Sequence, residues 1–98
     1  MATFDDFIAA IKREWQPLTV ILFGSRGRGE GRADSDYDLL IVSERFRGVA
    51  FTDRMTPFHR VWPLREDLEC ICLTPGEFER GKKMISITAK AVAEGLVL

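Results

Sequence analysis

The chain has 98 residues, of which 46% are hydrophobic, and a formal net charge of −1 at pH 7. This length suffices for a single domain, residues 1–98, built around one hydrophobic core. The near-zero charge argues against a protein that wraps nucleic acid, because such domains are strongly basic. No apolar run approaches the length of a membrane span, and the acidic N-terminus differs from a basic signal peptide. We therefore expect a cytoplasmic protein that does not contact the membrane.

The first predicted element is an amphipathic helix that ends near Trp15. Thr3 is a suitable N-cap, acidic residues follow in the first turn, and Pro17 stops the helix. The apolar positions at helical spacing are Phe4, Phe7, Ile8, Ile11 and Trp15. Such an aromatic stripe could stack on bases, but it more often packs against a core. The continuous apolar run from Leu18 to Phe23 then predicts a strand buried on both faces.

A second apolar strand is predicted from Asp36 to Val42, and it begins with two aspartates. Because residues i and i+2 of a strand share a face, Asp36 and Asp38 point the same way into one small space. Two carboxylates at that separation repel each other unless a cation neutralises them. Oxygen ligands favour a hard cation such as Mg²⁺ or Mn²⁺. The pair therefore predicts a metal site.

The connection between these strands, Gly24 to Ser35, is rich in glycine and arginine. It is barely as long as the crossover that a parallel pair requires, so antiparallel pairing is the more economical topology. Antiparallel pairing places the end of the first strand beside the start of the second, and hence Gly24 and Ser25 beside the aspartates. Backbone N–H groups after Gly24 and the Ser25 hydroxyl would then form an anion cradle. Phosphate and metal would meet at one corner of the sheet.

The same connection holds three arginines, Arg26, Arg28 and Arg32. In a chain of nearly neutral total charge, this cluster is better explained by one polyphosphate than by a nucleic-acid polymer. Other glycine motifs fit less well, because the glycines lack the spacing of the dinucleotide-binding turn and no Walker lysine follows them.

The clear pattern is lost after Val42. Residues 43–51 mix charges with phenylalanine and glycine, which predicts a mobile loop. A helix is predicted within Thr52 to Trp62, and Pro63 ends it. His59 is the only histidine; without partners at metal-ligand spacing, it is more often a surface or packing residue than a catalytic one.

Residues 68–73 form the third predicted strand. About two dozen residues separate it from the second strand, which allows a helical crossover and hence parallel pairing. Parallel pairing brings Glu69 level with Asp36 and Asp38. Asp67 lies two residues earlier on the same face. Both acidic residues could also be no more than charges at the start of a strand.

Cys70 and Cys72 are the two cysteines of the chain, and they lie on one face of this strand. Two thiols cannot supply a four-ligand zinc site, and we expect small buried apolar residues rather than a disulfide. This pattern fits a reducing compartment.

Two helices are predicted after the third strand. Thr74 is the N-cap of the first, and Glu77 completes a capping box. The second runs from Met84 to Glu94 with Gly95 as its C-cap. Its apolar stripe consists of Ile85, Thr88, Ala89, Val92 and Ala93. Residues 96–98 are predicted either as a short extra strand or as an apolar tail that meets a partner.

The run Gly24-Ser25, followed ten residues after Ser25 by Ser35-Asp36-Tyr37-Asp38-Leu39, resembles the G-S-x(9)-S-D-x-D-[LI] signature of the DNA polymerase β-like nucleotidyltransferases. The fuller run from Leu22 to Gly29 is most similar to the minimal nucleotidyltransferases, small prokaryotic proteins often paired with a helical HEPN protein. The resemblance covers nearly the whole chain. It implies an α/β nucleotidyltransferase fold, with a small mixed β-sheet flanked by α-helices.

The resemblance also implies transfer of a nucleoside monophosphate from an NTP, with ATP as the expected donor, to an acceptor hydroxyl. The implied catalytic and metal-binding residues are Asp36, Asp38 and Glu69, which would hold two Mg²⁺ ions. The implied nucleotide-binding residues are Gly24, Ser25, Arg26 and Ser35. The family usually has aspartate as the third carboxylate, so Glu69 is a departure, and Asp67 is the alternative for that role.

A HEPN-type toxin is the partner that the resemblance implies. The protein would then act as an antitoxin that adenylylates a hydroxyl of this partner. The alternative is a catalytically weak or inactive nucleotide-binding module that neutralises the partner by forming a complex. The expected docking surfaces are residues 96–98, Phe46 and Phe51.

Overall fold

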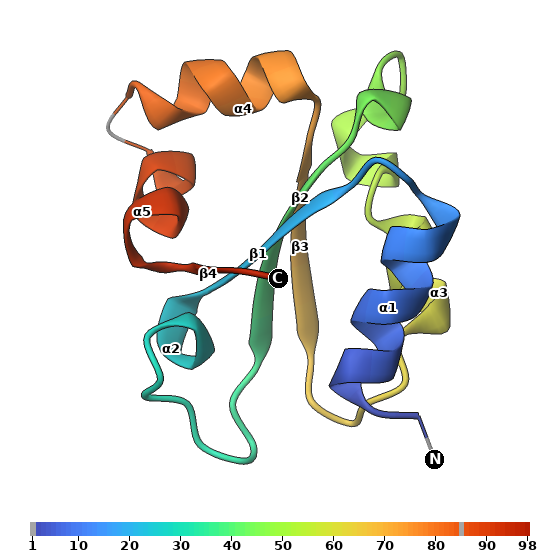
Figure 1. Ribbon diagram of the computed structural model, residues 1–98, viewed down its shortest axis with the longest axis vertical. Helices are drawn as coiled ribbons and strands as arrows, with labels where there is room; N and C mark the ends of the chain where they lie inside the picture. Colours follow the sequence, from blue (N-terminus) through green and yellow to red (C-terminus); the bar gives the residue numbers. More distant parts are fainter. Residues whose placement is uncertain (1, 85) are drawn as a thin grey trace.

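The computed structural model describes residues 2–84 and 86–98 (Figure 1). In chain order the elements are α1 (Phe4–Glu14), β1 (Thr19–Phe23), α2 (Gly24–Gly27), β2 (Tyr37–Val42), the 3-10 turns η1 (Glu44–Phe46) and η2 (Phe51–Asp53), α3 (Thr56–Val61), β3 (Leu68–Leu73), α4 (Pro75–Lys82), α5 (Ile87–Glu94) and β4 (Leu96–Val97). The predicted N-terminal helix, the three predicted strands and the helix after Thr74 are all present, close to their predicted bounds.

The strands form one mixed sheet in the order β3-β2-β1-β4. β1 pairs antiparallel with β2, and β2 pairs parallel with β3, which confirms both pairings predicted from the connection lengths. β4 pairs antiparallel with β1, so residues 96 and 97 form the short extra strand rather than a free tail. The chain therefore has the predicted α/β architecture, with β1 and β2 in the middle of the sheet.

Helices cover both faces of the sheet. Alternate residues of each strand point to opposite faces. One face packs against α1 and α3 in a core that contains Phe7, Ile11, Val20, Leu22, Leu39, Ile41, Phe46, Phe58, Leu68, Cys70 and Cys72. The other face carries a smaller cluster of Ile21, Leu40, Leu73 and Ala91 below α5. In Figure 1, α1 and α3 lie to the right of the strands and α5 lies to the left.

The segment 43–51 differs from the mobile loop that the sequence predicts. Ser43 caps η1, because its hydroxyl accepts a hydrogen bond from the Arg45 backbone N–H. Phe46, expected as an exposed docking surface, is only 1% exposed. Its ring packs 5.4 Å from Trp15 and 6.0 Å from Phe58, so the aromatic core takes it up. Phe51 remains half exposed, as expected.

The helix α5 begins later than predicted. The expected start was Met84, but Ser86 is the N-cap and Ile87 the first helical residue. The Ser86 hydroxyl accepts a hydrogen bond from the Ala89 backbone N–H at 3.2 Å, which fixes this start. Ile85, predicted in the apolar stripe, lies outside the described residues.

Gly95 is the C-cap of α5, as predicted, but it does not adopt the left-handed conformation that usually favours glycine there. Its φ is −86°. A Cβ at this position would overlap the Ala91 carbonyl oxygen and a methyl group of Ile21. Glycine is required because α5 and β1 approach each other closely.

Both cysteines are buried and free, as predicted. No helix among the described residues has the length and apolar character needed to cross a membrane.

Candidate active site

The predicted site residues meet where β1 ends and where β2 and β3 begin. Phe23 lies opposite Asp38, and Asp38 lies opposite Glu69. Because directly paired residues share a face, the side chains of Asp38 and Glu69 project to the same side of the sheet. The parallel register therefore does bring Glu69 level with the aspartates.

Gly24 is in direct contact with Asp38. Its φ is +69°, a conformation that residues with a side chain rarely adopt. A Cβ on Gly24 would also overlap the Oδ2 atom of Asp38. The backbone at the start of α2 can therefore lie against this carboxylate only because residue 24 has no side chain.

The loop after Gly24 folds back over α2. The backbone N–H of Glu30 donates to the Ser25 carbonyl at 2.9 Å. Gly27 is buried against the Leu22 carbonyl, where a Cβ would overlap the oxygen. These close contacts hold the segment after Gly24, for which the sequence predicts an anion cradle, at the end of β1.

Three acidic side chains share this corner. The pKa of Asp38 is raised above its ordinary value, first by burial and then by the negative charges of Glu69 and Asp36. The ion pairs among the described residues involve none of these carboxylates. The corner therefore carries negative charge that no basic side chain neutralises, and a bound cation would relieve this repulsion.

The chemistry of these groups suits a hard cation. All three are oxygen donors, and Mg²⁺ is usually held by one or two carboxylates, waters and substrate phosphates. Within residues 2–84 and 86–98, no three His, Cys, Asp or Glu side chains lie close enough to ligate one ion by themselves. A metal at this corner would therefore need phosphate or water oxygens as further ligands.

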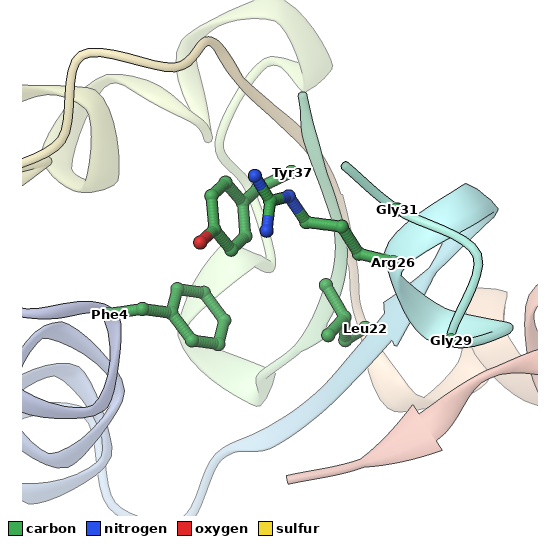
Figure 2. Close-up of a pocket in the computed structure, with 6 residues that line it drawn as sticks. All are labelled: Phe4, Leu22, Arg26, Gly29, Gly31 and Tyr37. Atoms are coloured by element: carbon green, nitrogen blue, oxygen red, sulfur yellow. The ribbon is translucent and has the colours of Figure 1, made fainter. Parts of the chain in front are cut away.

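Arg26 links α2 to the segment that leads into β2. Its Nε donates to the Ser35 carbonyl at 2.9 Å and its Nη2 to the Ala33 carbonyl at 3.0 Å. The guanidinium also lies over the ring of Tyr37, 3.8 Å from the ring centre, and Tyr37 stacks on Phe4 (Figure 2). Arg26 thus ties α2 to the turn that precedes Asp36.

Figure 2 shows the pocket beside this stack, which has a volume of about 290 Å³. Phe4, Leu22 and Tyr37 form its apolar part, and Arg26 and two loop glycines complete it. Tyr37 and Asp38 are neighbours in β2 and point to opposite faces. The pocket therefore lies on the α1 face, away from Asp38 and Glu69.

Ser35 closes the turn that precedes Asp36. Its hydroxyl accepts from the Arg32 N–H at 2.8 Å, and its own N–H donates to the Arg32 carbonyl at 3.1 Å. Arg28, which the sequence groups with a polyphosphate, pairs at the surface with Glu30 at 3.1 Å and Glu94 at 3.5 Å. Arg26 therefore contacts the turn before β2, whereas Arg28 forms ion pairs with Glu30 and Glu94 at the surface.

The geometry distinguishes Glu69 from Asp67. Glu69 is in register with Asp38 and contributes to its raised pKa, whereas Asp67 precedes β3. The Asp67 carbonyl accepts from the Tyr37 N–H at 2.9 Å and so forms the first rung of the β2–β3 ladder.

The sequence predicted that Gly24 lies beside the aspartates, but not that a side chain at residue 24 would strike Asp38, and it missed the anchoring of Arg26. The glycine of the G-S motif was a signal for this close approach, since the lack of a side chain is useful where a backbone approaches a ligand or a carboxylate. Nothing in the spacing indicates that Arg26 reaches the carbonyls before Asp36.

Comparison with known proteins identifies the fold. The family model described as "Nucleotidyltransferase domain" matches residues 5–92. A crystal structure of a candidate nucleotidyltransferase from Sulfolobus solfataricus is similar to this chain with a TM-score of 0.64 and 26% sequence identity, over 94% of this chain and 72% of that protein. None of the curated proteins compared matches the chain.

Proposed function

Because the chain belongs to the nucleotidyltransferase domain family, we propose that it transfers AMP from ATP to a hydroxyl group of a partner protein. The observation that carries this proposal is the meeting of Gly24, Asp38 and Glu69 at one end of the sheet. A glycine cradle for phosphates and a set of unneutralised carboxylates are the two parts that phosphoryl-group chemistry needs at one place.

The backbone after Gly24 and the Ser25 hydroxyl bind the terminal phosphates of ATP in this proposal. Arg26 and Ser35 support the nucleotide by holding the loop, since both make hydrogen bonds within residues 32–35.

Asp36, Asp38 and Glu69 would hold two Mg²⁺ ions, which when bound supply charge neutralisation at the phosphates and lower the pKa of the acceptor hydroxyl. Glu69 lies at the outer strand of the sheet, where an acceptor can approach. There its carboxylate accepts the proton of the acceptor hydroxyl as the oxygen attacks the α-phosphorus. The bond from that phosphorus to the bridging oxygen breaks, and pyrophosphate leaves.

The proposed acceptor is a cytoplasmic HEPN-type toxin, which the transfer would inactivate. The elements that the structure describes beyond the sheet are helices that pack against it, so in this proposal the acceptor comes from a separate partner. Positioning an acceptor contributes several kcal/mol to catalysis, and a partner that docks its own hydroxyl would supply this positioning. Leu96 and Val97 are 53% and 74% exposed, which supports them as part of the surface on which the proposed partner docks.

A second function follows from the glutamate at the third carboxylate position. Its longer side chain shifts the carboxylate, and a shift of about 1 Å is enough to slow a reaction strongly. In that case the protein would bind the nucleotide and neutralise its partner by forming a complex.

Intact-mass spectrometry of the protein co-expressed with a HEPN protein separates these functions. Mass increments of AMP size on the partner that disappear in Asp38→Asn support the enzyme. A stable complex without added mass supports neutralisation by binding. The absence of both complex and increment would overturn the proposed partner.

A further inference from the structure

The outer edge of β3 has no strand partner among the described residues, and it runs directly past Glu69. Within residues 2–84 and 86–98, the one strand that pairs with β3 is β2. The Tyr37 N–H donates to the Asp67 carbonyl and the Ser43 N–H to the Leu73 carbonyl. In a parallel pair of strands, these two hydrogen bonds fix which residues of β3 face β2. The N–H and C=O groups of residues 69 and 71 point toward β2, and those of residues 68, 70 and 72 point outward.

The outward groups have few partners. The Cys72 carbonyl accepts from Nη1 of Arg54 at 3.1 Å. Among residues 2–84 and 86–98, no hydrogen bond reaches the outward N–H and C=O groups of Leu68 and Cys70. Arg54 thus closes one end of the edge and leaves open the part that flanks Glu69.

A groove follows this open edge. A cavity of about 330 Å³ is lined by Met55 and His59 and by residues 68–71 of β3. Leu68 and Cys70 belong to one face of the sheet and Glu69 and Ile71 to the other. Because both faces contribute, the cavity lies along the edge of the strand rather than on one face.

The sequence of β3 offers this edge little protection, although the side chains of Leu68 and Cys70 pack into the core and leave the residues only 5% and 7% exposed. Exposed edge strands are commonly blocked by lysine, proline, a bulge or a covering element. β3 contains no lysine or proline, and its single charged residue is Glu69.

We propose that the acceptor segment binds as an added β-strand along Leu68–Cys70, which places its hydroxyl residue beside Glu69. Only an extended polypeptide offers N–H and C=O groups at the spacing of these free groups. A side chain opposite Glu69 on the added strand has its Cβ about 5 Å from that of Glu69. A serine, threonine or tyrosine there brings its hydroxyl to the carboxylate that takes its proton.

This inference rests on the proposed function for its chemistry but not for its docking. The transfer itself is the one described above: the peptide oxygen bonds to the α-phosphorus, pyrophosphate leaves, and the proton goes to Glu69. Strand addition fixes the register by backbone hydrogen bonds, so the acceptor needs an extended, hydroxyl-bearing segment rather than one particular sequence.

Amide hydrogen exchange measured by NMR on the full chain tests the docking. The probe is the peptide acetyl-Thr-Val-Thr-Tyr-Thr-Val-Thr-amide, and the control is the same peptide N-methylated along its central amides. At a peptide concentration about ten times its Kd, exchange of the Leu68 and Cys70 amides slows about tenfold. The amides of Glu69 and Ile71, already bonded to β2, serve as the internal control and do not change. The N-methylated peptide gives no protection.

A transfer assay provides the second test. Cys70→Pro removes an outward N–H and obstructs the edge while keeping the bonds to β2. Cys70→Ala is the matched control, because it keeps the N–H. We expect KM for the peptide to rise at least about tenfold in Cys70→Pro alone, with unchanged affinity for Mg²⁺–ATP. If Cys70→Pro does not fold, the amide-exchange experiment on the unmodified chain still tests whether the peptide docks along β3.

The outcomes separate the two proposals. Transfer to the peptide without protection of Leu68 and Cys70 overturns the docking and leaves the proposed function intact. Protection of both amides without any transfer or Mg²⁺–ATP binding supports the docking and overturns the proposed function. Peptide binding that instead perturbs β4 or the pocket of Figure 2 overturns the docking site.

Discussion

Gly24 joins the two halves of the site, because its backbone lies where a side chain would strike Asp38. Gly24→Ala therefore combines an unfavourable φ of +69° with this overlap. Gly29 has a similar φ of +76° with nothing within 4 Å of its Cβ position, so Gly29→Ala is the matched control. We expect the alanine at 29 to lower the free energy of unfolding by about 1 kcal/mol and the alanine at 24 by about 2 kcal/mol or more.

Urea denaturation measures this difference, and calorimetric titration with Mg²⁺–ATP measures the effect on the site. Affinity should fall in Gly24→Ala and stay unchanged in Gly29→Ala. Equal losses of stability in the two variants would show that the contact with Asp38 is unimportant.

Asp38 provides a prediction in which stability and binding change in opposite directions. Its pKa is raised, so its ionised form is disfavoured in the folded chain, and stability falls as pH rises from its ordinary pKa through the folded value. Asp38→Asn removes this repulsion and should stabilise the free protein by about 0.5 kcal/mol at pH 7. Mg²⁺–ATP binding should be lost. Asp34→Asn, in the exposed loop, should change neither property; undiminished Mg²⁺–ATP affinity in Asp38→Asn would refute the metal assignment.

Some of the residue positions in and around the site could be predicted from the sequence, and others could not. The shared face of Asp36 and Asp38 follows from the two-residue period of a strand, and the alignment of Glu69 follows from a crossover length that allows parallel pairing. The nearness of Gly24 to the aspartates follows from antiparallel pairing, whereas the positive φ of Gly24 and the overlap that a side chain there would make with Asp38 depend on how tightly α2 turns after β1. The burial of Phe46 depends on space between α1 and α3, which no local pattern encodes.

At the scale of elements, Arg26 connects α2 to the start of β2 through two carbonyls and the Tyr37 ring. Arg26→Lys keeps the charge but loses the planar fork and most of the stacking. We expect faster amide exchange in residues 30–35 and about tenfold weaker Mg²⁺–ATP binding, corresponding to about 1.4 kcal/mol. Arg32→Lys is the control in the same loop. Unchanged exchange with unchanged affinity would contradict the positioning role of Arg26.

Arg54 and Glu77 hold α4 to the end of β3. Arg54 is 8% exposed, and its Nη1 donates to Glu77 at 2.6 Å and to the Cys72 carbonyl. This bond and that of the Thr74 N–H lower the pKa of Glu77 to about 2. The ionised Glu77 therefore contributes its full stabilisation of the folded protein above the ordinary pKa of glutamate. This contribution is lost as pH falls through the folded pKa of about 2.

Glu77→Gln should destabilise the protein by about 2 kcal/mol at pH 7, because Arg54 is left buried without its counter-charge. The difference from the unmodified chain should shrink as pH falls below 4. Glu79→Gln, which breaks the exposed pair with Lys82, should cost less than about 0.5 kcal/mol. Equal effects of the two substitutions in chemical denaturation would refute the role of the buried pair.

The capping of these elements was predictable in part. Thr74 and Glu77 form the expected capping box, since the signal lies within four consecutive residues. The start of α5 was predicted too early, because the apolar stripe continues upstream of Ser86 and only the cap hydrogen bond sets the boundary. Arg54 gave no sequence signal, since its partners come from β3 and α4.

At the scale of the whole molecule, the sheet has its candidate site at one end and different edges on its two sides. β4 is short and apolar, whereas β3 carries Glu69. The α/β class and the mixed strand pairing could be predicted because they follow from connection lengths. Which backbone groups of the edge strand β3 have hydrogen-bond partners could not be predicted, because this depends on contacts such as that of Arg54 with the Cys72 carbonyl.

The buried thiols of β3 give this edge a chemical property of its own. Cys70 and Cys72 are 7% and 3% exposed, and the pKa of Cys70 is raised by its contact with Cys72 and by burial. Both thiols should therefore resist alkylation in the folded chain and react only when the strand separates from the α3 side. Iodoacetamide labelling followed by mass spectrometry would then time the detachment of the strand that holds Glu69. We expect Glu77→Gln to accelerate labelling and Glu79→Gln to leave it unchanged. The labelling rate of two cysteines without a catalytic role would then report how often β3, the strand that carries Glu69, separates from its neighbours.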